Sequence, residues 1–165
     1  MLRGAAAMSA VLERARLRSP LDGVSDDAWS RFVDALTVDD DSGLRQGMPR
    51  PFNARTHAGG LGCFGLLPRR LVDVGVAKAV RVIGGKTIAV GLRRDFLSPL
   101  VQRDALVDSM RRYDAELAKV TLPSEISRSG ALALYHRLGP EALAKWQKHR
   151  QRSTIALFQR ANGLF

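Results

Sequence analysis

The sequence has one cysteine, few aromatic residues and no long apolar run. With Cys63 as the only cysteine, no disulfide can form within the chain. Because lone cysteines are most often small buried apolar residues, we expect Cys63 in the core rather than in a catalytic site. No stretch approaches the ~20 uninterrupted apolar residues of a membrane-spanning helix, so we expect no membrane span. Aromatic residues make up only 6% of the chain, which is too few for a ladder that stacks nucleic-acid bases.

Acidic residues are scarce beside basic ones. The chain has 26 Lys and Arg against 16 Asp and Glu, a net charge of +10. A field of this sign attracts polyanions such as nucleic acid, teichoic acid, anionic lipid head groups or peptidoglycan carboxylates, and it does not choose among them. The alternative is that the arginines only cover a solvated surface. Without a recognition motif, we expect any nucleic-acid binding to be non-specific.

Length and composition predict one globular domain with a short extension. The 165 residues are 45% hydrophobic and 25% charged, which suits a single packed core. Residues 5–18 can form an amphipathic helix that Ser19-Pro20 ends. Charged residues from Glu13 onward follow the apolar start too soon for a clear signal peptide. We therefore predict an N-terminal helical extension over 1–24 and one domain over 25–165.

The hydrophobic spacing predicts a mainly α (α+β) fold, a compact helical domain with one small β-hairpin. Two β-branched runs, 80–83 and 87–90, flank Gly84-Gly85, which is typical of a hairpin. Glycines and prolines over 43–62 indicate a loop. Caps and apolar periodicity predict helices over the following segments: 25–38, 68–75, 98–117, from Ser127 or Ser129 to Tyr135 with a break at Gly139-Pro140, 141–149 and 153–162. Ser25 is the expected N-cap of the first, and Ser98-Pro99 is expected to begin the third, with Leu100, Leu106, Met110, Tyr113 and Leu117 on its apolar face.

Two segments carry a resemblance to a known family. Residues 62–68, Gly-Cys-Phe-Gly-Leu-Leu-Pro, resemble the Gly-Leu-Met-Gln-Leu-Met-Pro segment of lytic transglycosylases, which belong to the lysozyme-like superfamily. Residues 131–140, Ala-Leu-Ala-Leu-Tyr-His-Arg-Leu-Gly-Pro, resemble that family's Ala-Leu-Ala-Ala-Tyr-Asn-Ala-Gly-Pro, with one residue inserted before Gly139. A Lys-Trp pair at 145–146 follows, as in the family. The segments occur in the family's order, and the resemblance covers residues 26–150.

The resemblance implies a lysozyme-like fold that binds the glycan strands of peptidoglycan, with no cofactor and no metal. Glycine at 62 and 65 would let the backbone approach a bulky ligand. Tyr135 would offer an aromatic face and a hydroxyl to a sugar, and the alternative is a core tyrosine. Trp146 is expected in the core. The expected substrate-binding residues are Ser42, Gly62, Phe64, Gly65, Leu66, Tyr135 and His136.

The family's general acid is a glutamate at a helix end, and the matching residue here is Asp41, within Asp41-Ser42-Gly43-Leu44. A helix C-terminus and the neighbours Asp39 and Asp40 favour a protonated carboxyl. Aspartate is one methylene shorter, and a misplacement of about 1 Å can cost ~100-fold in rate. The alternatives are that 39–41 is a solvated acidic turn, or that Glu125 or Asp34 is the acid.

A second register leaves no acid at that position. It places Phe52-Asn53 on the family's Phe-Asn and puts Pro49 where the acid would stand, and Gly65 replaces the family's glutamine in either register. His57, His136 and His149 lack ligand-like spacing, so no metal site is expected.

Three functions follow from these observations. The first is a peptidoglycan-binding lysozyme-like protein that cleaves the MurNAc–GlcNAc bond, associated with a phage virion or tail. The second keeps the fold without catalysis, as a structural or wall-binding subunit of a phage-type assembly. The third is a basic nucleic-acid-binding protein. The first two imply synthesis in the cytoplasm and action at the cell wall or periplasm, with other particle subunits as partners.

Overall fold

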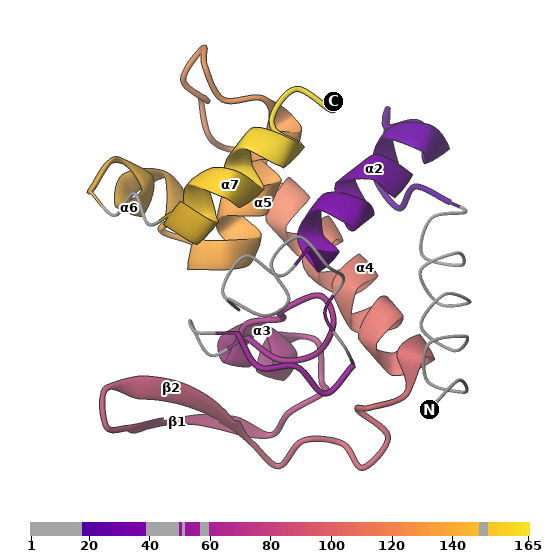
Figure 1. Cartoon of the computed structure of the whole chain (residues 1–165), viewed down its shortest axis with the longest axis vertical. Coiled ribbons are helices and arrows are strands. Elements are labelled where there is room, and N and C mark those ends of the chain that lie inside the picture. The colour runs from indigo at the N-terminus through magenta and orange to yellow at the C-terminus, as the bar shows by residue number, and fades with distance from the viewer. Residues whose placement is uncertain (1–17, 39–49, 51, 57–59, 149–151) are drawn as a thin grey trace.

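The computed structural model describes residues 18–38, 50, 52–56, 60–148 and 152–165. These residues form a mainly α domain with one antiparallel hairpin, as the hydrophobic spacing predicts (Figure 1). The helices are α2 (Asp26–Thr37), α3 (Pro68–Asp73), α4 (Pro99–Leu117), α5 (Arg128–Leu138), α6 (Ala142–Lys148) and α7 (Arg152–Ala161). The strands are β1 (Ala79–Ile83) and β2 (Lys86–Val90). In the described part of the chain, no helix is long and apolar enough to cross a membrane.

Helix α2 begins where the sequence predicts. The Ser25 hydroxyl accepts a hydrogen bond from the backbone N–H of Ala28 at 3.2 Å, an N-cap. Its apolar stripe is fully buried and lies against α7, as the neighbouring ribbons in Figure 1 show. The rings of Trp29 and Phe32 lie 5.8 Å apart, and Phe32 meets Phe165 edge-on at 5.4 Å. Burial of these rings stabilises the contact between α2 and the C-terminal end of the chain.

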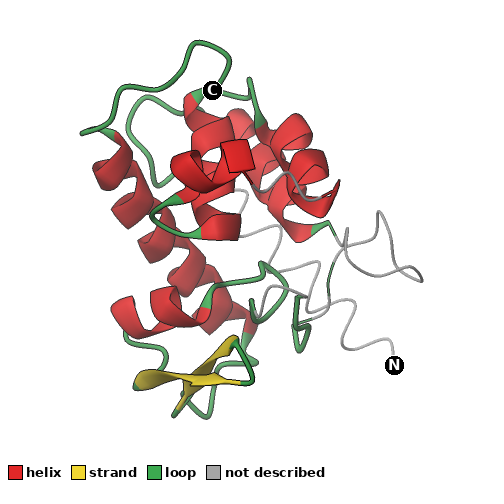
Figure 2. Ribbon diagram, turned by 90° about the vertical axis from the view of Figure 1, so that its left-hand side faces the viewer, coloured by secondary structure: helices red, strands yellow, loops and turns green. Residues whose placement is uncertain are grey.

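The predicted hairpin is confirmed, with each strand one residue longer at one end than expected. Val82 pairs with Thr87 and Ile83 with Lys86 around the Gly84-Gly85 turn, where both glycines have positive φ. Such a turn matches the right-handed twist of the strands. Helix α3 packs against both strands, and the hairpin forms one end of the molecule (Figures 1 and 2).

Helix α4 is also as predicted, except at Leu100. We expected Leu100 on the buried face, but its side chain is 44% exposed. Leu100 lies six residues before Leu106, which at 100° per residue places it roughly 120° away around the helix. The buried face instead continues from Leu106 back to Gln102, one turn earlier. Gln102 on this buried face forms a hydrogen bond with Cys63, in the loop that precedes α3.

Serine hydroxyls at the start of α5 form hydrogen bonds with the backbone of residues 163–165. Ser127 caps α5 by accepting from Gly130 at 3.1 Å, and it also accepts from the N–H of Gly163 at 2.7 Å. Ser129 accepts from the last two backbone N–H groups. A Cβ on Gly130 would lie 2.2 Å from the side-chain oxygen of Asn162. The close contact of α5 with this turn therefore requires glycine at 130.

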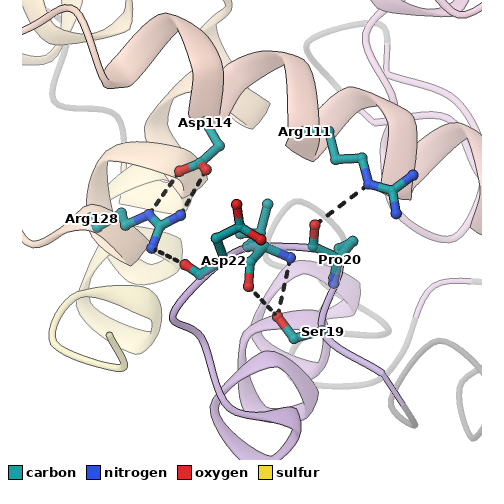
Figure 3. Close-up of polar contacts among 7 residues, drawn as sticks. Ser19, Pro20, Asp22, Arg111, Asp114 and Arg128 are labelled. Carbon is teal, nitrogen blue, oxygen red and sulfur yellow. Dashed lines mark hydrogen bonds and ion pairs between the residues drawn. The ribbon is translucent and has the colours of Figure 1, made fainter.

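The described end of the predicted N-terminal extension packs on the domain (Figure 3). Arg128 binds the Asp114 carboxylate through two bonds of 2.7 Å and donates a third, at 2.8 Å, to the carbonyl of Asp22. Arg111 donates to the carbonyl of Pro20 at 3.4 Å. Residues 18–24 are thus held against α4 and α5, and the helix predicted over 5–18 falls almost entirely outside the described residues.

Candidate functional site

The segment that carries the first resemblance is a compact turn. Leu61 forms isolated β-bridges with both Arg55 and Leu66. The N–H of Gly65 donates to the carbonyl of Gly62 at 3.1 Å, and both glycines have positive φ, 78° and 65°. An L-residue with a side chain is strained in this conformation, so the turn requires its two glycines.

A buried glutamine holds this turn against α4. Gln102 accepts from the N–H of Cys63 at 3.0 Å and donates to the carbonyls of Phe52 at 2.8 Å and Phe96 at 3.0 Å. A Cβ on Gly62 would lie 2.3 Å from the Gln102 Oε1 atom. Glycine at 62 therefore leaves room for the side chain of Gln102. Sequence analysis missed Gln102, although a polar residue four positions before Leu106 on an apolar face was the available signal.

The two segments that carry the resemblance are in direct contact. The Nε2 atom of His136 on α5 makes a buried hydrogen bond with the carbonyl oxygen of Phe64 in the turn. Because a carbonyl only accepts, Nε2 carries the proton. We call this bond and the residues beside it, Gly65, Leu66 and Tyr135, the motif contact. Segments that lie 72 residues apart in the chain thus meet at one place.

Tyr135 lies at the edge of an aromatic and charged cluster. Its ring meets Tyr113 edge-on at 5.7 Å, and the Arg70 guanidinium lies 3.9 Å over the Tyr113 ring. Tyr135 is only 5% exposed, and burial, with a smaller effect of Glu116, raises the pKa of its hydroxyl. Within the described residues this hydroxyl has no hydrogen-bond partner, so it is free to bond with a ligand.

The carboxylates of this cluster belong to residues that sequence analysis did not single out. Arg70 forms ion pairs with Asp73 at 3.4 Å and with Glu116 at 3.5 Å. Arg70 is almost fully buried, while the two carboxylate side chains are 49% and 41% exposed. The arginine thus links α3 to the C-terminal end of α4. Glu116 is a charged neighbour of Tyr135 that is already paired with a guanidinium.

The structure places the predicted substrate-binding residues as follows. Gly62, Phe64, Gly65, Leu66, Tyr135 and His136 come together, and Asp41 and Ser42 lie outside the described residues. Phe64 and Leu66 are fully buried core side chains. The space beside Gly65 is occupied by Thr56 and Arg50, at 3.0 and 3.4 Å from where a Cβ would stand. In this state, the glycines of the turn accommodate protein groups.

The chain matches no family model, no curated protein and no solved structure. The likeness to lytic transglycosylases therefore rests on the two segments.

The end of α2, where the family's acid would follow, is capped by a buried arginine. The Arg50 Nη1 atom donates to the carbonyl oxygen of Leu36 at 2.7 Å. The backbone N–H of Arg50 donates to the carbonyl oxygen of Thr37 at 2.9 Å. Helix ends commonly satisfy their last carbonyls in this way. The positive charge opposes the effect of the helix dipole, which favours a protonated carboxyl there.

Neither alternative acid lies at the motif contact. Asp34 is exposed on α2. Glu125 precedes the N-terminus of α5, the end opposite to Tyr135, and lines a pocket of about 470 Å³ together with Trp146 and Phe158. Trp146 is buried, as expected. This pocket is thus separate from the motif contact.

Cys63 is buried, and burial raises the pKa of its thiol to about 12. A thiol in that state supplies no thiolate near neutral pH. Its expected place in the core is confirmed. Among the described residues, no group of three or more His, Cys, Asp or Glu side chains could hold a metal ion.

Stability is expected to fall on mild acidification because of His136. Burial lowers the pKa of His136 from 6.5 to about 4. Below pH 6.5 His136 becomes protonated in the unfolded chain but stays neutral in the folded protein. The free energy of unfolding therefore decreases as the pH falls. Between pH 7 and pH 5 the free energy of unfolding should drop by about 2 kcal/mol, measured by urea titration.

A variant without this imidazole provides the control for the measurement. His136→Gln should flatten the profile even if its stability is lower throughout. An unchanged free energy of unfolding between pH 7 and pH 5 in the wild-type protein would show that His136 is not held neutral.

Proposed function

We propose that this protein is a lysozyme-like module that binds the glycan strands of peptidoglycan beside Tyr135. One observation carries the proposal: the bond between His136 and the Phe64 carbonyl, which joins the two segments that resemble lytic transglycosylases. In the structure these two segments, 72 residues apart in the chain, meet in the core, as a shared site would require. The resemblance supplies the ligand class, and the contact between the two segments that carry it supports the proposal.

The chemistry around Tyr135 also suits a glycan. The Tyr135 hydroxyl, which has no hydrogen-bond partner among the described residues, can bond to a sugar at the edge of the buried rings. The partly exposed carboxylates of Asp73 and Glu116 are acceptors for sugar hydroxyls. The net charge of +10 attracts the free carboxylates of the peptide stems over a longer range.

Binding to purified murein sacculi tests this proposal. The wild-type protein should sediment with sacculi, and Tyr135→Phe should bind about 3–10-fold more weakly, since one hydrogen bond contributes about 0.5–1.5 kcal/mol. Tyr113→Phe is the matched control, because it removes the hydroxyl of the adjoining ring, which already interacts with Arg70. It should lower stability slightly and leave binding unchanged.

Two results would refute the binding proposal. One is a wild-type protein that stays in the supernatant with sacculi at low salt. The other is equal binding by the wild-type protein and Tyr135→Phe, which would make Tyr135 an ordinary core residue.

Catalysis is a separate part of the proposal, with Asp41 as the acid. If it holds, the protein should release soluble anhydro-muropeptides from sacculi, and Asp41→Asn should lower that release about 100-fold or more. The absence of such products at every value from about pH 4 to pH 8 would remove the enzyme. Binding without cleavage would then leave the non-catalytic wall-binding subunit of a phage-type assembly, which the Arg50 cap on α2 favours.

A further inference from the structure

The hairpin and its flanks form a basic region without acidic residues. From residue 74 to residue 94 the chain has no Asp or Glu. All of its basic side chains there are exposed: Lys78, Arg81, Lys86, Arg93 and Arg94. Within the described residues only Arg93 among them forms an ion pair, with Asp95 at 2.7 Å. The other four charges are available to an anionic partner.

The pleat of the hairpin separates a core-facing side from a solvent-facing side. Ala89 packs against the core, and its partner Val80 shares that side. Because side chains alternate along a strand, the opposite side carries three cross-strand pairs: Ala79 with Val90, Arg81 with Ile88 and Ile83 with Lys86. The last two pairs each set one cation beside one aliphatic side chain. The solvent-facing side is therefore basic and apolar at the same time.

The tip of the hairpin exposes large aliphatic side chains. Val82 is 68% exposed and Ile83 59% exposed, beside the exposed Gly84-Gly85 turn. The hairpin lies at one end of the molecule, where its tip extends beyond α3 (Figure 1). An exposed apolar group of this kind next to basic residues is typical of an interaction surface.

We propose that the solvent-facing side and tip of the β1–β2 hairpin bind the surface of a membrane that contains anionic lipid. Ile83 and Ile88, which share a side with Arg81 and Lys86, insert at the level of the head groups, while the two basic residues contact lipid phosphates. Nucleic acid suits this surface less well. The chain has no aromatic residue from 65 to 95 to stack on bases, and Ile83 and Ile88 offer no hydrogen bond to a base edge.

This inference does not depend on the proposed glycan binding, since the hairpin is a different surface. It makes the protein a peripheral membrane binder that lies on a bilayer without spanning it. The role is compatible with a wall-acting module, because it would hold the protein at a membrane beneath its polymer.

Vesicle co-sedimentation of the full chain tests the proposal. The protein should bind vesicles of mixed phosphatidylglycerol and phosphatidylcholine and not vesicles of phosphatidylcholine alone. Each basic residue at an anionic surface contributes about fivefold to binding, so Arg81→Gln with Lys86→Gln should weaken it about 25-fold. Ile83→Ser should weaken it about tenfold. The matched control is Arg112→Gln with Lys119→Gln, two exposed charges toward the C-terminal end of α4.

Three outcomes would overturn it. The wild-type protein does not bind the anionic vesicles at low salt. The hairpin and control variants lose binding equally, which would assign the effect to net charge alone. Or the hairpin variants bind the vesicles normally but lose affinity for duplex DNA, which would make nucleic acid the partner. Unchanged thermal unfolding of the variants confirms that these exposed substitutions preserve the fold.

Discussion

Replacing Gln102 with leucine should lower the free energy of unfolding by about 3–5 kcal/mol. The side chain is fully buried and satisfies three backbone groups, the N–H of Cys63 and the carbonyls of Phe52 and Phe96. Leucine fills a similar volume and leaves all three unpaired, at about 1–3 kcal/mol each. Partial solvation of the loosened turn should reduce the sum. Urea unfolding at pH 7 measures the loss.

The neighbouring residue provides the control. Arg103 pairs with the adjacent Asp104 on the outside of α4, so Arg103→Ala should change stability by less than about 0.5 kcal/mol. Gln102→Leu should also weaken sacculus binding, because the turn of the motif contact loses its attachment to α4. A stability loss below about 1 kcal/mol would show that the turn is not held by this side chain.

Trp29→Ala should destabilise the protein by a comparable amount, about 3–5 kcal/mol. Trp29 is fully buried, its ring lies against Phe32, and its helix packs on α7. The cavity left behind cannot close without moving α2, so the loss exceeds the transfer free energy of the ring. Trp29→Phe retains much of the volume and should cost clearly less. Thermal unfolding followed by circular dichroism compares the two.

An exposed residue of the same helix is the control for Trp29. Asp27 pairs with Arg31 at 2.7 Å, but both side chains are about 70% exposed. Asp27→Ala should therefore cost less than about 1 kcal/mol. If Trp29→Ala proves no more harmful than Asp27→Ala, α2 does not pack in the core as described.

Local signals in the sequence were sufficient for most of the elements. Ser25 before an apolar stripe predicted α2, Ser98-Pro99 predicted the start of α4, and Gly84-Gly85 between β-branched runs predicted the hairpin. Each signal acts within a few residues, through a cap, a fixed φ or a turn. Leu100 was misplaced because a helical stripe can be drawn through an exposed aliphatic residue as easily as through a buried one.

The candidate site was only partly accessible from sequence. Tyr135 and His136 were singled out through the resemblance, but the partners that place them were not. Gln102 lies 39 residues from Cys63 in the turn, and Arg70 pairs with Glu116, 46 residues away. Arg70 also contacts Tyr113, the ring that packs on Tyr135. Their roles depend on the packing of α3, α4 and α5, which no local pattern encodes.

The amino-acid sequence alone determined the helices, the hairpin, the positive charge and the buried place of Cys63, because each depends on neighbours along the chain or on composition. Only the tertiary structure decided that His136 bonds to Phe64, that Gly62 accommodates Gln102, and that the hairpin turns a basic and aliphatic side outward. Those facts depend on which distant side chains share a buried space or a face. Hydrogen bonding and core packing decide which distant side chains lie together, and they act only when the whole chain has folded.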